Sequence, residues 1–315
     1  MKAIATDLAG EVCSVGIDTR ATDRLVAIYH RSLARRASNL LGEAERPQLE
    51  DLVRGTRRLD PATVHFLYRG RENIDAAETA RCLRQAGALE PTEVYSGSTD
   101  QPWLRHGLRE ALRSLGWDEE NVGRVLDSVP SQTQRALELA RQALRSAWPE
   151  AWQEHNTLVR YLVYVEGPVR SATVQSTFGA IYAEVVEASD PLRMFELLLH
   201  ESGHHALALR EQFARFLHNP DALGTHALRN DPRPLRGVLH AAYVTCRMAS
   251  GLRRYLQVHP AGGPLDGCPV QERLEFAHEA IRQALAVLVA AEWTDDGLLL
   301  KAALEACAEQ EGALA

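Results

Sequence analysis

The feature that most constrains this chain is a pair of histidines, four residues apart, inside an apolar segment. The segment contains His200-Glu201-Ser202-Gly203-His204, an H-E-x-x-H pattern with leucine-rich flanks on both sides. Residues four apart share one face of an α-helix, so both imidazoles can bind one metal ion, with Glu201 beside the first ligand. Because each buried histidine needs a polar partner, the apolar setting favours a metal site over two separate core histidines.

The residues around this motif predict a long helix. Asp190 is a suitable N-cap, and Pro191 suits the first helical position. Apolar residues then recur at helical spacing from Phe195 to Phe216. We therefore expect a helix over 191–217 that presents both histidines on one face.

The composition is that of an ordinary globular protein. The chain has 315 residues, of which 45% are hydrophobic and 24% charged, and its net charge is −7. This charge gives no general reason to expect a nucleic-acid or membrane partner. The five cysteines are scattered, which argues against a disulfide framework and a cysteine zinc site. With no signal-peptide pattern and no long apolar run, we expect a soluble cytoplasmic protein.

The pattern of the chain changes at about residue 150. Residues 1–150 predict a helical N-terminal domain, and residues 151–315 predict a metal-binding catalytic domain that contains the HExxH helix. The predicted helices are 21–42, 44–59, 61–69, 74–87, 104–115, 131–148, 235–257, 270–291 and 296–310. The predicted strands are 158–165, 172–175 and 181–186. The expected class is α+β: mostly helical, with a small sheet packed on a zincin-like HExxH helix.

Two histidines do not complete a metal site, since catalytic zinc takes three protein ligands. The metzincin pattern would place a histidine at position 210, where this chain has Arg210. A thermolysin-like pattern would need a glutamate well beyond the motif, but none occurs between Glu211 and Glu272. Asp221 and Asp231 lie in turn-like sequence, where both have plausible turn or capping roles.

A histidine is therefore the better third ligand. His240 lies inside the next predicted helix, and its face also carries Arg236, Tyr243 and Arg247. This polar stripe stands out on an otherwise apolar helix. We predict His240 as the third ligand and keep Asp221, Asp231 and His226 as the alternatives.

Three segments carry a resemblance to a known family. They are Ser171 to Gly179, the motif His200 to His205, and Asn230 to Tyr243, which reads NDPRPLRGVLHAAY. Together they resemble the HExxH-motif putative peptide-modification proteins found beside ribosomal peptide gene clusters. This family includes α-ketoglutarate-dependent, HExxH-type peptide β-hydroxylases. The resemblance covers roughly residues 155–250 and leaves the first 150 residues unassigned.

The resemblance implies an iron site. His200, His204 and His240 would hold Fe(II), leaving the opposite face to α-ketoglutarate and dioxygen, which departs from the usual two-histidine, one-carboxylate arrangement. The resemblance leaves the chemical role of the candidate catalytic residue Glu201 open; at an iron site it could fix a ligand or a substrate group. The distal carboxylate of α-ketoglutarate favours a guanidinium partner. The candidates are Arg236, then Arg247 and Arg233.

The expected function is hydroxylation of a β-carbon in a ribosomally made precursor peptide. The alternative is a zinc-dependent metallopeptidase in which Glu201 is the general base. A third class is a peptide-binding protein with structural histidines. In the hydroxylase, the strand at 181–186 would be an edge strand that pairs with the peptide backbone. Pockets near Ser176 to Gly179 and Tyr243 would then select the modified residue.

Overall fold

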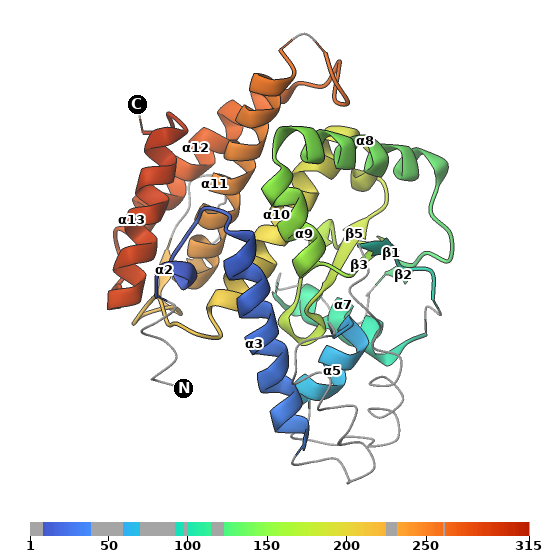
Figure 1. The fold of residues 1–315 in the computed structure, drawn as a ribbon, viewed down its shortest axis with the longest axis horizontal. Coiled ribbons are helices and arrows are strands. Elements are labelled where there is room, and N and C mark those ends of the chain that lie inside the picture. The colour runs from blue at the N-terminus through green and yellow to red at the C-terminus, as the bar shows by residue number, and fades with distance from the viewer. Residues whose placement is uncertain are drawn as a thin grey trace. The chain divides into compact units, whose positions relative to one another are not determined.

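The computed structural model describes residues 9–38, 59–69, 92–97, 100–114, 123–224, 232–260 and 262–314. These residues are mostly helical with a small mixed sheet (Figure 1), which confirms the predicted α+β class. The chain divides into two compact units that interleave in sequence. The first takes Met1–Ala21, Arg135–Glu154 and Pro191–Ala315, and the second takes Thr22–Gln134 and His155–Asp190. Each unit draws residues from both sides of the boundary expected at 150.

The first unit is built from helices. It holds α2 (Ala9–Val12), most of α8 (Ser131–Ala147), the start of α9 (Pro149–Leu158), α10 (Pro191–Arg210), α11 (Leu235–Val258), α12 (Val270–Leu288) and α13 (Asp295–Gln310). A two-stranded ribbon of β6 (Leu223–Gly224) and β7 (Arg233–Pro234) precedes α11. Helix α11 is central, because α10, α12 and α13 all pack against it.

The second unit contains the sheet. Its strands are β1 (Glu93–Val94), β2 (Arg124–Val125), β3 (Tyr161–Glu166), β4 (Ser171–Ala172) and β5 (Ala180–Glu184). The order is β1-β3-β5-β4, with β2 also paired to β3. The neighbouring helices of this unit are α3 (Thr19–Ser38), α5 (Pro61–Arg69) and α7 (Pro102–Ser114), and its short 3-10 turns are η2 (Gln175–Thr177) and η3 (Glu187–Ser189).

Strand β5 has partners on both sides, so the expectation of an edge strand at 181–186 is wrong. It runs parallel to β3 over its whole length, from Ala180 opposite Tyr161 to Glu184 opposite Val165. On its other side, Tyr182 and Ala183 pair with the antiparallel β4. The short β4 was foreseen only as a possible strand, and it occupies the edge that a peptide would need.

Most predicted elements match the described helices to within a few residues. Helix α5 has the predicted bounds, and α11, α12 and α13 begin where expected. Helix α10 ends at Arg210, before the predicted 217, because Gln212 and Phe213 close tighter turns onto Leu209 and Arg210. Pro149 ends α8 as predicted but also starts α9, which was not foreseen. The predicted helix at 74–87 lies outside the described residues, as does the one at 44–59 except for its last residue.

The core of the second unit lies between α7 and the sheet. Trp103, Leu104, Leu108 and Ala111 of α7 form one buried cluster with Val163, Val165, Ala180 and Tyr182. Gly107 sits where α7 meets Tyr182, whose hydroxyl would collide with any Cβ at this position. Tyr182 is fully buried and its hydroxyl lies 3.1 Å from the Thr177 hydroxyl, so it has no room to retreat.

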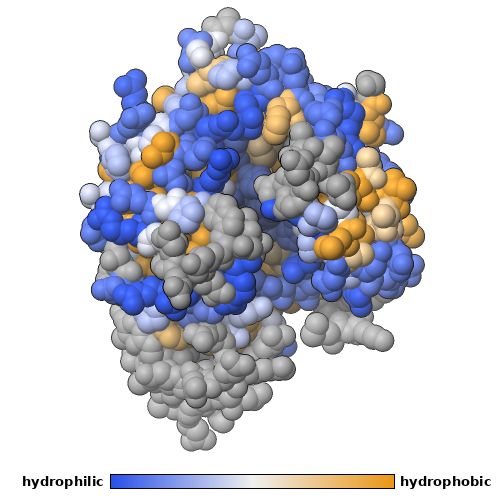
Figure 2. Space-filling model, turned by 180° about the vertical axis from the view of Figure 1, so that it is seen from behind, coloured by the Kyte–Doolittle hydropathy of each residue, from blue (hydrophilic) through white to orange (hydrophobic). Residues whose placement is uncertain are grey.

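The surface of the described residues is largely polar. Figure 2 shows hydrophilic residues over most of the visible face, with hydrophobic residues gathered on the side of α12 and α13. Exposed apolar residues there include Val289, Leu298 and Leu299. Within the described ranges, every helix is too short or too polar to cross a membrane.

Replacing Gly107 with alanine tests the contact between α7 and the sheet. The added methyl group would displace the buried Tyr182 ring, so Gly107→Ala should lower the free energy of unfolding by about 1–3 kcal/mol. Urea denaturation followed by circular dichroism measures this change.

The matched control is Gly237→Ala in α11, where a Cβ would meet no heavy atom within 4 Å. This control should be neutral or stabilise by up to about 1 kcal/mol, since alanine is the better helix former. Equal stabilities for the two variants would contradict the packing described for Gly107.

Candidate metal centre

Two glycines let α10 and α11 approach closely. A Cβ at Gly203 of α10 would lie 3.0 Å from Cγ1 of Val244, and a Cβ at Gly251 of α11 would collide with Leu199. Both helices therefore need a small residue at the points where they touch. The histidines of α10 are thereby held against α11.

Three imidazoles lie together at this contact. The Nε2 atoms of His200 and His204 are 3.1 Å apart, and the Nδ1 atoms of His204 and His240 are 3.2 Å apart. The ring centroids are separated by 4.6 Å and 5.5 Å respectively. The structure therefore brings together the three histidines that the sequence predicts as ligands. Met248 adds a thioether, whose Sδ lies 3.3 Å from Nδ1 of His200.

The first pair fits a metal ion. Two nitrogens bound to one ion at about 2.0–2.1 Å should stand roughly 3.0–3.4 Å apart, which matches His200 and His204. Burial holds the pKa of His204 well below its usual value, and the neighbouring His200 and His240 lower it further. A neutral imidazole is the form that binds metals.

In the side-chain rotamers present, His240 does not face the position between the Nε2 atoms of His200 and His204. It faces Nδ1 of His204, whereas His200 faces Nε2 of that ring. In the part of the chain that the structure describes, no set of three or more His, Cys, Asp or Glu side chains is arranged as a metal site. One ring has to rotate before three nitrogens can converge, and the third-ligand role of His240 stays a prediction.

A carboxylate that the sequence analysis passed over lies behind His240. Oε2 of Glu211 is 3.2 Å from Nε2 of His240, and Arg236 donates to both Glu211 oxygens at 2.6 Å and 3.0 Å. Burial disfavours the charge on Glu211, but His240 and Arg236 outweigh it and lower the pKa of Glu211 to about 2. Glu211 follows His204 by two helical turns and so shares its face. This spacing was the signal in the sequence that could have identified Glu211 as a site residue.

Two of the three arginines predicted for α-ketoglutarate are already paired. Arg236 binds Glu211, as described above. Arg247 is 2% exposed and binds Glu154 at 2.5 Å and 3.1 Å, while its Nε donates to the Val15 carbonyl at 3.2 Å. Arg233 is half-buried in β7. The guanidinium donors of Arg236 and Arg247 are thus occupied by glutamates.

Arg210 is a further arginine that the sequence did not single out. It closes α10 and is fully buried. Its Nη1 donates to the Ala206 carbonyl at 3.0 Å, while Nε and Nη2 have no hydrogen-bond partner among the described residues. A buried guanidinium with open donors is well suited to bind an anion.

The other residues predicted for the site lie in different parts of the chain. Glu201 is buried at 2% exposure, next to His200 on α10. Asp221 is exposed on a turn, and the alternatives His226 and Asp231 lie outside the described residues. Tyr243 is buried in the first unit, with its hydroxyl 3.4 Å from the Ser14 carbonyl, whereas Ser176 to Gly179 belong to the second unit.

Comparisons with known proteins leave the family open. No protein-family model matches the chain, and no curated protein matches it. The histidine geometry therefore remains the main indication of function, while the resemblance carried by His200 to His205 and residues 230–243 stays a prediction.

Removing either motif histidine should abolish metal binding. His200→Ala and His204→Ala each delete one member of the pair that fits the ion. We expect affinity for Zn²⁺ or Co²⁺ to fall by more than about a hundredfold, beyond the typical effect of losing a residue that only supports a ligand. Calorimetric titration of the metal-free protein measures the loss.

His218→Ala is the control, because His218 is exposed and lies outside the histidine cluster. If His200→Ala or His204→Ala binds the metal ion as tightly as the wild type, the hypothesis of a metal centre at these histidines is wrong.

Proposed function

We propose that this protein is a cytoplasmic peptide-modifying oxygenase. It would use Fe(II), α-ketoglutarate and dioxygen to hydroxylate a β-carbon in a ribosomally made precursor peptide. The observation that carries the proposal is the cluster of His200, His204 and His240 between α10 and α11, in the segments that bear the family resemblance. Histidine-rich sites suit Fe(II) as well as Zn²⁺.

Each residue of the cluster has a role in this proposal. When bound, the iron with its two co-substrates supplies the oxidising chemistry. His200 and His204 would hold the ion through Nε2, and His240 would be the third ligand in a rotated ring position. The Glu211 carboxylate lies 3.2 Å from Nε2 of His240 and would favour a proton there, which would leave Nδ1 as the metal-binding atom. Glu201 is buried beside His200, where it can orient a ligand or a substrate group.

The distal carboxylate of α-ketoglutarate needs a guanidinium with donors to spare. Arg236 and Arg247 use theirs on Glu211 and Glu154, which weakens both as candidates. Arg233 stays a candidate on the basis of the sequence alone. Arg210 joins it, because two of its buried nitrogens are without hydrogen-bond partners in the described chain.

A zinc-dependent peptidase is the second candidate. The 3.1 Å separation of the His200 and His204 nitrogens suits a tetrahedral zinc site equally well. Glu201 would then be the general base that activates a water molecule for attack on a peptide bond. The two candidates differ in their dependence on α-ketoglutarate and in their products.

The reaction itself distinguishes them. The protein is incubated with a precursor peptide from its own gene cluster, Fe(II), α-ketoglutarate and ascorbate, and the products are analysed by mass spectrometry. We expect a gain of about 16 Da, one oxygen atom, with an equal amount of succinate, as iron oxygenase chemistry requires.

His204→Ala should give neither product. If the protein instead cleaves the peptide in the presence of Zn²⁺ and without α-ketoglutarate, the oxygenase proposal is wrong and the peptidase is supported.

Glu211 should support metal binding through His240. Glu211→Gln removes the charge that holds His240, so metal affinity should fall by about 10–100-fold, as for other residues that orient a metal ligand. Arg236→Gln should have a smaller effect, since the Glu211 carboxylate stays beside His240. Calorimetric titration with Co²⁺ gives both values.

The matched control is Glu279→Gln on α12. Glu279 also binds a neighbouring arginine, Arg282, but lies on the exposed face of another helix. If Glu211→Gln binds Co²⁺ like this control, Glu211 has no part in the metal centre.

A further inference from the structure

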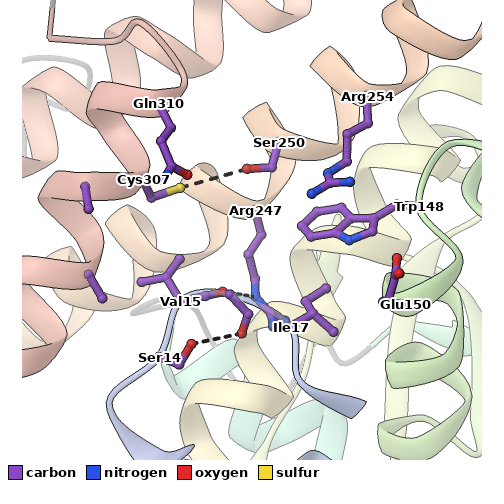
Figure 3. A pocket seen from close by; sticks show the side chains of 13 residues that line it. Ser14, Val15, Ile17, Trp148, Glu150, Arg247, Ser250, Arg254, Cys307 and Gln310 are labelled. Carbon is purple, nitrogen blue, oxygen red and sulfur yellow. Dashed lines mark hydrogen bonds between the residues drawn. The ribbon is translucent and has the colours of Figure 1, made fainter. Parts of the chain in front are cut away.

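The first unit contains a polar pocket that none of the clustered histidines lines. Its volume is about 480 Å³, and its walls come from α11, α13, the α8–α9 junction and residues 14–17. Pockets that hold small ligands usually measure roughly 300–1,000 Å³, so this one has room for a small molecule or a few atoms of a peptide. Figure 3 shows the side chains that line it.

Arg254 presents an unpaired positive charge to this pocket. Its guanidinium lies 4.8 Å from the centre of the Trp148 ring, and Trp148 is itself only 6% exposed. The stacking occupies the flat face of the guanidinium and leaves its N–H edge open. Within the described chain, Arg254 forms no ion pair and no hydrogen bond.

The opposite wall adds polar groups. Figure 3 shows Gln310, Ser250 and Cys307 across the pocket from Trp148. The Gln310 side chain is exposed, and within the described residues its amide makes no hydrogen bond, so its two N–H groups can also donate. Ser250 is already engaged, because its hydroxyl donates to Glu311 at 2.7 Å. The pocket thus offers donors from Arg254 and Gln310.

Besides Arg254, two charged residues line the pocket, Arg247 and Glu150. Arg247 is buried there, but Glu154 and the Val15 carbonyl take its donors. Glu150 also lines the pocket and is exposed. Its negative charge would repel a dianion more than a monoanion.

We propose that this pocket binds a monocarboxylate with an apolar body. The carboxylate would accept hydrogen bonds from Arg254 and Gln310, and the apolar part would lie against Trp148 and the alanines of α13. The carboxylate could belong to a free organic acid or to an acidic peptide side chain. The site is independent of the metal centre and of the proposed oxygenase activity.

The first probe is phenylacetate, titrated into the full-length protein and followed by calorimetry. Phenylacetamide has the same shape without the charge. We expect phenylacetate to bind at least about tenfold more tightly, since hydrogen bonds to charged groups are the stronger ones. Equal binding of the two compounds, or no binding of phenylacetate at millimolar concentrations, would overturn the proposal.

Two arginine variants locate the site. Arg254→Gln should weaken phenylacetate binding at least about tenfold by removing a charged donor. Arg145→Gln is the matched control, because Arg145 stacks on Trp152 at 4.7 Å in the same way but does not line the pocket. A similar loss in both variants would show that the pocket is not the binding site.

A charge variant and a peptide pair complete the test. Glu150→Gln should tighten binding of phenylacetate, and it should tighten binding of the dianion phenyl phosphate more.

Capped Phe-Glu and Phe-Gln dipeptides then identify the source of the carboxylate. Preference for Phe-Glu over Phe-Gln assigns the pocket to an acidic peptide, whereas binding of phenylacetate alone assigns it to a free acid. Tighter binding of phenyl phosphate than of phenylacetate by the wild-type protein would overturn the monocarboxylate assignment.

Discussion

The close contact of α10 and α11 is the constraint on which the candidate metal centre depends. Helices normally keep about 8–10 Å between their axes, and the shorter end of that range needs small residues at the contact. Gly203 and Gly251 supply them from opposite sides. At this contact, imidazoles from the two helices come within 3.2 Å of each other. The histidine cluster is therefore a result of packing as much as of the motif.

Several charged side chains near this contact are paired, although the buried Arg210 keeps two nitrogens without a hydrogen-bond partner in the described chain. Glu154 neutralises Arg247, and Glu211 lies between Arg236 and His240. Removing one partner of such a pair leaves an uncompensated charge, which is far more costly than losing the pair as a whole. These pairs fix the surroundings of the histidines, and they explain why two arginines that looked suited to a ligand are engaged with the protein itself.

The sequence predicted the helices better than the site. Helical period and proline position located α5, α11 and α13, because both signals are local. Pro149 gave a correct end for α8 but hid the start of α9, since proline suits either role. Glu211 was passed over because its importance comes from Arg236 and His240, which lie on another helix. Pairings across helices, and the interleaving of the two units, depend on tertiary contacts that no sequence window contains.

The glycine of the motif limits how relatives of this chain can be recognised. In H-E-x-x-H the two middle positions are usually treated as free, but here the second is Gly203. A Cβ at that position would already lie 3.0 Å from Val244, so anything beyond alanine would push the helices apart. A search that leaves this position open would collect motifs that cannot share the packing. A pattern that requires a small residue before the second histidine would select chains able to build the same two-helix site.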